Sequence, residues 1–233
     1  MCRGCQRFFR SSGWGVSGMA VDLDCEELAS EELIASLREV ELPTLGHFLE
    51  DGFCTPRMVP INEGPQMVGP ARTLDLREPD ALAVNRALHA LRPGDVLVIR
   101  VASGLHAPVG AVTAAAAIAQ GAAGIVVDGP VTDAAALRNV QDRLPVFATG
   151  LIARTTKRTG SFGDDVLDCE VEIDGVTVRP GDLVLGDRQG VLVLPPTGPG
   201  NEVLQAALAS DWGEPALLAR IAAGEDLREL LPG

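Results

Sequence analysis

Short hydrophobic runs alternate along the first two thirds of the chain with segments of helical periodicity or high helix propensity. The predicted strands are 67–76, 96–100, 125–127 and 145–148, and the helices between them are 80–91, 111–120 and 133–140. A strand, a helix and a second strand in succession are typical of parallel pairing with right-handed crossovers. We therefore predict an α/β protein built around a sheet with parallel strands.

The rhythm changes after residue 160. Residues 169–173 and 176–179 flank the pair Asp174-Gly175, which predicts a β-hairpin with a tight turn. Thr44 is expected to cap a short helix that begins at the next residue, and Pro43 is expected to stop the helix before it. The remaining predicted elements are strands at 183–185 and 190–194 and helices at 22–40, 45–50, 201–210 and 215–223.

Composition narrows the class of protein. The chain has 233 residues, of which 46% are hydrophobic but only 3% aromatic, so Ala, Val, Leu and Ile must build the core. The net charge of −13 argues against a nucleic-acid partner, because phosphate backbones are bound by clustered Lys and Arg. No segment is apolar for long enough to span a membrane, so we expect no membrane partner. Five cysteines are an odd number in a chain of ordinary size, which favours a reducing cytoplasm.

The beginning of the chain differs from the rest. The first ten residues carry Arg3, Arg7 and Arg10 without an acid, and they lack the apolar region of a secretory signal. We predict that residues 1–20 form a disordered extension and that residues 21–233 form a single domain with helices at its C-terminal end, since no linker divides them.

The stretch from Gly121 to Asp133 is the strongest candidate for a functional site. Its apolar run ends at Asp128, which we expect to begin a turn, and Asp133 follows at the start of the next predicted helix. Upstream, Gly110 opens an alanine-rich helix whose first N–H groups are suited to holding an anion. Ligands of α/β proteins bind at the carboxyl ends of strands, so the two segments together predict an anion cradle beside a lone carboxylate.

Several short motifs occur in a fixed order. They are VGPA at 68–71, PGDVLV at 93–98, Gly110 at a helix start, GIVVDG at 124–129, Asp133, PVFA at 145–148, GVxVxPGD at 175–182 and GDxxGVxVxP at 186–195. Each motif alone is common, but their order and spacing resemble the RraA-like family. That family includes the 4-hydroxy-4-methyl-2-oxoglutarate aldolases and the regulator of ribonuclease E activity. The resemblance covers about residues 40 to 225.

The resemblance implies a layered α/β/β sandwich with a central mixed sheet, of the swivelling-domain type. It also implies a homotrimer or homohexamer whose active site lies between subunits and uses Mg²⁺ or Mn²⁺. The aldolase motif is a Gly at a helix start, an Arg-Asp pair and an acid three residues past the Asp. Gly110 and Asp133 match this motif, whereas Thr132 replaces the Arg and Ala136 replaces the second acid.

Roles follow from the match. Asp133 is expected to position the metal, and the first turn of the helix, Gly110, Ala111, Val112 and Thr113, is expected to hold a substrate carboxylate. Thr132 offers one neutral hydrogen bond where the family's Arg makes a bidentate charged contact. The structural alternatives are that Gly110 permits a tight turn and that Asp133 stabilises a helix start.

Two further residues are candidates for moving charge or protons. Lys157, in a basic segment with Arg154 and Arg158, is a possible replacement for the missing Arg, and a solvated loop is the alternative. His106 precedes the anion cradle and is a candidate general acid or base, or else an incidental loop residue. The sequence thus predicts a metal-dependent lyase acting on a small oxo-acid, by aldol cleavage or decarboxylation. The alternative is a non-catalytic regulatory or binding protein.

Overall fold

The computed structural model describes residues 29–102, 104–158, 160 and 163–231. The predicted extension at 1–20 lies outside the described residues, as does the beginning of the predicted helix at 22–40. Within the described part of the chain, no helix is long and apolar enough to cross a membrane.

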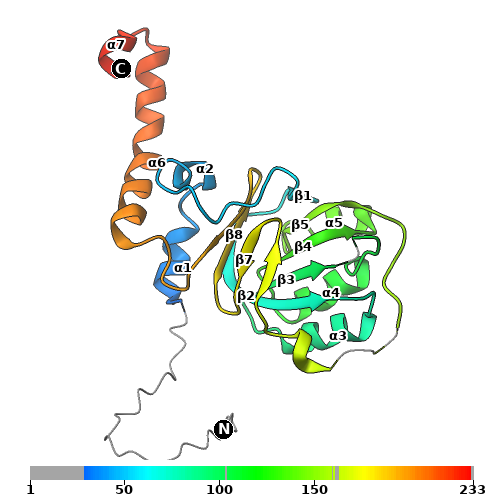
Figure 1. Ribbon diagram of the computed structural model, residues 1–233. Coiled ribbons are helices and arrows are strands. Elements are labelled where there is room, and N and C mark those ends of the chain that lie inside the picture. Colours follow the sequence, from blue (N-terminus) through cyan, green and yellow to red (C-terminus); the bar gives the residue numbers. More distant parts are fainter. Residues whose placement is uncertain (1–28, 103, 159, 161–162, 232–233) are drawn as a thin grey trace, which may run out of the picture.

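A seven-stranded sheet forms the centre of the molecule (Figure 1). In spatial order its strands are β1 (Val59–Pro60), β5 (Val146–Leu151), β4 (Gly124–Val131), β3 (Val96–Val101), β2 (Met67–Leu76), β8 (Leu183–Asp187) and β9 (Gly190–Leu194). Strands β2 to β5 are parallel, as the alternation of strands and helices predicted. The outer strands β1, β8 and β9 pair antiparallel, so the sheet is mixed and the α/β fold class is confirmed.

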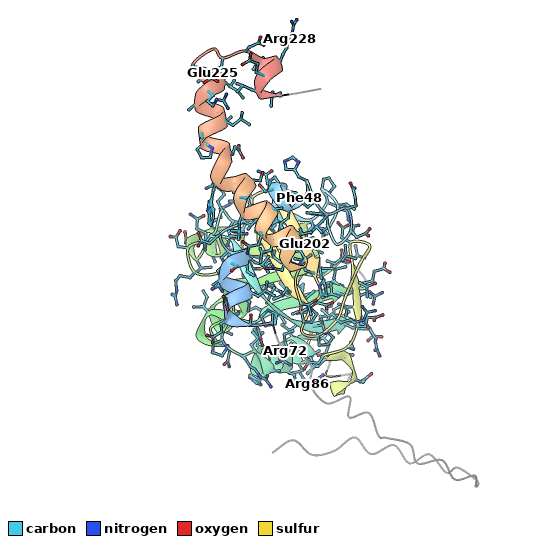
Figure 2. The ribbon with its side chains drawn as sticks, turned by 90° about the vertical axis from the view of Figure 1, so that its left-hand side faces the viewer. Phe48, Arg72, Arg86, Glu202, Glu225 and Arg228 are labelled. Atoms are coloured by element: carbon cyan, nitrogen blue, oxygen red, sulfur yellow. The ribbon has the colours of Figure 1, made fainter. Side chains whose placement is uncertain are left out.

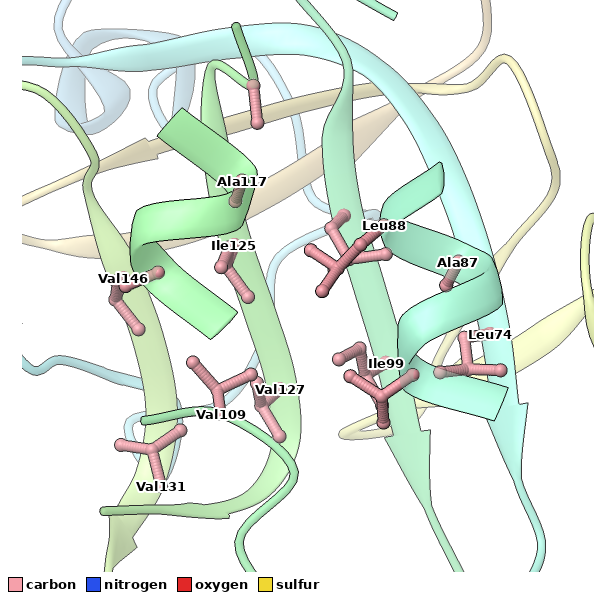
Figure 3. Packing of buried hydrophobic residues seen from close by; sticks show 14 of the residues in the cluster. Leu74, Ala87, Leu88, Ile99, Val109, Ala117, Ile125, Val127, Val131 and Val146 are labelled. Atoms are coloured by element: carbon pink, nitrogen blue, oxygen red, sulfur yellow. The ribbon is translucent and has the colours of Figure 1, made fainter. Parts of the chain in front are cut away.

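Three crossover helices cover one face of this sheet: α3 (Ala81–Ala90), α4 (Ala111–Ala119) and α5 (Ala134–Asn139). Asp80 begins α3, because its buried carboxylate accepts hydrogen bonds from the N–H groups of Leu82 and Ala83. Figure 3 shows Ala117 of α4 and Leu88 of α3 above the strand residues Ile99 and Ile125. The small alanines let the helices lie close to the sheet and compensate for the scarcity of aromatic side chains.

The opposite face packs against a two-stranded hairpin, β6 (Val171–Ile173) and β7 (Val176–Val178). Val98 and Val126 of the sheet share a buried cluster with Ile173 of the hairpin. Asp174 and Gly175 make the turn, with positive φ at both residues, as the Asp-Gly pair predicted. The helices, the main sheet and the hairpin therefore form three layers.

The helices α1 (Glu31–Leu37) and α2 (Leu42–Leu45) and the start of α6 (Asn201–Ala222) lie beside β8 and β9. The chain also contains α7 (Leu227–Leu230) and a short 3₁₀ turn at Asp164–Val166. The first part of α6 is buried against α1 and α2, and the rest projects from the body together with α7 (Figures 1 and 2). Glu202 in Figure 2 lies over the body, whereas Glu225 and Arg228 lie at the far end of this projection.

Three local predictions were wrong. The separate helices at 201–210 and 215–223 form one helix, in which the exposed Pro215 removes a single backbone N–H. The short N-terminal helix starts after Glu41, with Pro43 in its first turn and Thr44 inside it. The predicted turn at Asp128 is a continuation of β4 with a register shift against β5 between Val127 and Pro130.

Candidate functional site

The carboxyl ends of the parallel strands β3, β4 and β5 bring the predicted site segments together. The N–H of Thr132 donates to the carbonyl of Val109 at 2.9 Å, which joins the β4 end to the loop before α4. The N–H of Ile152 donates to the carbonyl of Val131 at 2.9 Å, which joins the segment after β5 to the same place. Gly110 and Asp133 are therefore neighbours at this edge of the sheet.

Asp133 reaches the amino end of α4 directly. Its backbone is left-handed, with φ 54°, and its Oδ2 atom accepts a hydrogen bond of 3.0 Å from the N–H of Ala111. A Cβ atom on Gly110 would lie 2.6 Å from that oxygen and 2.8 Å from Cγ2 of Thr132, so a larger residue at position 110 would displace the side chains of Asp133 and Thr132. A left-handed non-glycine residue is strained, and Asp is among the residues that tolerate this conformation best.

This contact changes the expectation for the anion cradle. The Ala111 N–H is bound to Asp133, and the Thr113 hydroxyl donates to the carbonyl of Pro108 at 3.2 Å. Among the described residues, none accepts a hydrogen bond from the N–H groups of Val112 or Thr113. The N–H groups of the helix start that remain open are therefore those of Val112 and Thr113.

A hollow of about 240 Å³ lies beside Asp133. It is lined by Thr132, Asp133, Ala134, Leu151, Ile152 and Ala153. Asp133 is exposed, and Leu151 and Val112 expose 54% and 84% of their surfaces, so this edge is open and partly apolar. A larger hollow of about 560 Å³, between Phe48 and Arg179, contains none of the predicted site residues.

Lys157 does not join Asp133. Its N–H donates to the carbonyl of Pro79 at 3.1 Å, and its own carbonyl accepts from Ala81 at 2.8 Å. These bonds hold the Lys157 backbone beside the start of α3, the helix that connects β2 to β3. Asp133, in contrast, follows β4. The exposed Lys157 side chain therefore lies at a different part of the carboxyl edge of the sheet from Asp133.

His106 lies in the loop before α4 and is half-buried. Its Nδ1 atom is buried and has no hydrogen-bond partner within the described part of the chain. The next residue, Ala107, donates its N–H to the carbonyl of Arg154 at 2.7 Å, so the His106 loop is paired with the segment after β5. The sequence favoured Lys157 in that segment, whereas the pairing places Arg154 nearer to the hollow.

The residues at the site fit a divalent cation only in a minimal way. Across the described ranges, no three His, Cys, Asp or Glu side chains gather closely enough to enclose a metal. Asp133 offers one exposed carboxylate, whose Oδ2 is already held by Ala111. Mg²⁺ keeps several waters and needs few carboxylates, so this donor set suits an ion completed by water and substrate oxygens.

Asp128 belongs to a different network. Its carboxylate pairs with Arg57 at 3.0 Å and accepts from the N–H of Asp174 at 3.1 Å, on the hairpin side of the sheet. Burial, together with the negative charges of Asp174 and Asp128, raises the pKa of the Cys54 thiol to about 12. The network ties the segment at 54–57 to the β6–β7 turn and contributes nothing to the Asp133 hollow.

Comparison with known proteins identifies the family of this chain. The family model RraA-like, described as Aldolase/RraA, matches residues 41–193, about two thirds of the chain. The chain belongs to the RraA-like family. This confirms the resemblance inferred from the ordered motifs, which all lie within or just beyond the matched range.

Relatives of this RraA-like chain carry names of two kinds, those of aldolases and those of RNA-processing inhibitors. A Halalkalibacterium halodurans protein named "Putative 4-hydroxy-4-methyl-2-oxoglutarate aldolase" is 38% identical over 154 residues, covering 66% of this chain and 70% of that protein. The RNA-processing inhibitor RraA from Thermus thermophilus is 27% identical, with a TM-score of 0.59 over 69% of this chain and 95% of that one.

A second solved relative is an unusual member of the RNase ES inhibitor RraA family from Streptomyces coelicolor. It is 28% identical, with a TM-score of 0.61 over 82% of this chain and 96% of the other. These likenesses support the mixed α/β fold, and they show that the same scaffold is found in proteins named for two different functions.

Proposed function

We propose that this protein is a lyase that cleaves a small oxo-acid, by aldol cleavage or decarboxylation, with a divalent cation at Asp133. The observation that carries the proposal is the exposed Asp133 carboxylate, fixed at the amino end of α4 beside an open hollow. The similarity to a protein named as an aldolase supports the choice of reaction class.

Hydrogen-bond donors of the chain itself bind the substrate and stabilise the charge that develops on it. The N–H groups of Val112 and Thr113, at the positive end of α4, bind an anionic oxygen of the substrate. The Thr132 hydroxyl lines the hollow and donates one further hydrogen bond. As the carbon–carbon bond breaks, negative charge grows on the substrate oxygens, and these fixed donors stabilise it.

Asp133 is the residue that would hold the cation, either Mg²⁺ or Mn²⁺. Its Oδ2 is anchored by Ala111, and Asp133 lines the hollow. When bound, the cation supplies Lewis-acid chemistry at the 2-oxo group. His106 is the group we assign to proton transfer, while Lys157 is left out because its backbone lies beside α3.

We also infer that the protein works as a homotrimer or homohexamer in the cytoplasm. The projecting part of α6 exposes 74% of Trp212 and 55% of Leu218, and such apolar side chains favour burial against another subunit. Cys54 and Cys169 are free thiols, which suits a reducing compartment. Light scattering after size exclusion measures the assembly, and a monomer contradicts this inference.

Pyruvate release tests the proposed reaction. The wild-type protein is incubated with 4-hydroxy-2-oxo acids and with oxaloacetate, in Mg²⁺, Mn²⁺ or chelator, and pyruvate is followed by a coupled dehydrogenase. We expect metal-dependent release that Asp133→Ala abolishes, because that variant lacks the carboxylate at the helix end. Equal release by wild type and Asp133→Ala removes Asp133 from the mechanism.

Two substitutions in the family motif favour a second candidate, a non-catalytic binding protein. Thr132 stands in place of an Arg and Ala136 in place of an acid, so the site has lost one cation and one anion. Thr132→Arg separates the candidates. If this variant gains pyruvate release that the wild type lacks, the chain is a binding protein that has lost its activity.

A further inference from the structure

We propose that Arg154, with His106 beside it, forms the carboxylate-binding subsite of this protein and replaces the Arg absent at position 132. The ligand that fits is a short 2-oxo acid, whose carboxylate meets Arg154 and whose apolar remainder lies against Leu151. This inference rests on the proposed function, and it names residues that the family motif does not contain.

The lining of the hollow contains no cationic side chain that could bind a substrate carboxylate. Its only charged lining residue is Asp133, and the other lining residues are Thr132, Ala134, Leu151, Ile152 and Ala153. A divalent cation at Asp133 would bind the 2-oxo group of the substrate, but its carboxylate still needs a partner, and Asp133 already binds the first N–H group of α4. A side-chain cation at the rim supplies that partner.

Backbone pairing places Arg154 at that rim. The segment after β5 runs from Ile152, beside the end of β4, to Lys157, beside the start of α3. Arg154 follows directly after Ala153, the last lining residue of the hollow. Its carbonyl accepts the Ala107 N–H at 2.7 Å, so its backbone is fixed between the hollow and the loop that leads into α4.

The same pairing brings His106 and Arg154 side by side. Ala107 and Thr155 form a parallel bridge, and the Thr156 N–H returns to the Ala107 carbonyl at 3.1 Å. In a parallel pair, the residues that precede the bridged positions lie next to each other and on the same side. His106 and Arg154 precede this isolated bridge, so their backbones lie next to each other.

Both side chains have hydrogen-bonding capacity that the described chain does not use. Arg154 is exposed and makes no ion pair with a described acid, whereas Arg57, Arg72, Arg77, Arg100, Arg179 and Arg220 all do. His106 Nδ1 is buried without a partner, which is rare for a polar atom inside a protein. A substrate carboxylate bound by the Arg154 guanidinium would also lie close enough to His106 to accept a hydrogen bond from it.

Titration calorimetry tests this assignment, with pyruvate and with oxalate as probes in the presence of Mn²⁺. We expect Arg154→Ala to weaken binding about tenfold or more, since it removes a charged hydrogen-bonding pair. Arg154→Lys should fall between this variant and the wild type, because lysine keeps the charge and loses the planar fork. His106→Ala should lose affinity less than Arg154→Ala.

Arg143→Ala is the matched control, because Arg143 is exposed and lies before β5, at the opposite edge of the sheet. Its affinity should equal that of the wild type, and thermal unfolding of all variants should coincide. Wild-type affinity in Arg154→Ala overturns the inference, and so does an absence of binding in the wild type. Binding that depends on Arg154 without any pyruvate release leaves the subsite standing and overturns only the proposed reaction.

Discussion

At the residue scale, the site depends on a close approach between Gly110 and Asp133. The sequence placed a glycine at one segment end and an acid at another, and both lie at the same edge of the sheet. It did not reveal that the Asp133 carboxylate binds the Ala111 N–H, because that contact requires the left-handed backbone at residue 133. The same contact explains why the helix start offers its second and third N–H groups to a ligand.

Gly110→Ala is expected to weaken Mn²⁺-dependent oxalate binding and to destabilise the protein. The added methyl meets the Asp133 carboxylate at 2.6 Å, and forced overpacking typically costs about 1–3 kcal/mol. The control is Gly213→Ala, where a Cβ meets nothing within 4 Å and the helix gains propensity. Chemical unfolding and calorimetry measure both effects, and a Gly110→Ala protein as stable and as competent as Gly213→Ala contradicts the geometry.

Cys54 is expected to resist alkylation in the folded protein. Its pKa of about 12 leaves roughly one thiol in 10⁴ ionised near pH 8, and the thiolate is the reactive form. Mass spectrometry after iodoacetamide treatment compares Cys54 in native and unfolded samples. Asp174→Asn should raise the native rate, because one of the charges that opposes ionisation is gone. Equal rates in native and unfolded wild type are incompatible with this environment.

At the element scale, α6 joins the N-terminal helices to the sheet. Asp211 accepts hydrogen bonds from the Glu41 N–H and the Thr44 hydroxyl, so it caps α2 from a distant part of the chain. The sequence predicted two helices, at 201–210 and 215–223, whereas the structure has one continuous helix that contains Pro215. Whether a proline interrupts a helix depends on the partner that its missing N–H would have had, and that partner is visible only in three dimensions.

Asp211→Ala should lower the unfolding free energy by about 1–3 kcal/mol, the cost of leaving the Glu41 N–H and the Thr44 hydroxyl without their acceptor. Glu214→Ala is the control, because Glu214 is exposed on the same helix and makes no ion pair with another described residue. Urea unfolding followed by circular dichroism measures both variants. If the two lose stability equally, the anchoring of α2 by Asp211 is wrong.

At the scale of the whole molecule, charged side chains join strands on the hairpin face of the sheet. Asp75 of β2 pairs with Arg100 of β3 at 2.7 Å and with Arg77 at 2.8 Å. Burial alone would raise the pKa of Asp75, but the hydrogen bonds from Arg77 and Arg100 outweigh burial and lower it. A carboxyl group whose pKa is lowered by folding stabilises the folded protein at pH values above the group's ordinary pKa of 3.8.

Asp75→Asn should therefore destabilise the protein at neutral pH, and its difference from the wild type should shrink as the pH falls below the ordinary carboxyl range. The wild type loses this contribution on acidification because Asp75 becomes protonated, while the variant has none to lose. Urea unfolding from about pH 7 to about pH 3 measures the difference. A constant difference over the whole range would show that the ion pairs contribute nothing.

The overall architecture followed from local patterns where those patterns are strong. The buried strand at Met67–Leu76 and the parallel order of β2 to β5 were predictable, since each strand and helix has its own periodicity. The backbone partners of Lys157 and Arg154 could not be predicted. Irregular segments after strands have no periodicity, and tertiary contacts decide which segments they pair with. For this reason the sequence identified the basic segment, but it could not show that Arg154 is paired with the loop before α4.

The central claim is that Asp133 and the start of α4 hold a cation and an oxo-acid together. A crystal of the protein soaked with Mn²⁺ and oxalate tests it through the anomalous signal of manganese. We predict a manganese peak in coordination distance of the Asp133 carboxylate, with oxalate between the metal and the N–H groups of Val112 and Thr113. Manganese bound elsewhere, or an Asp133 that contacts Ala111 alone, would contradict the claim.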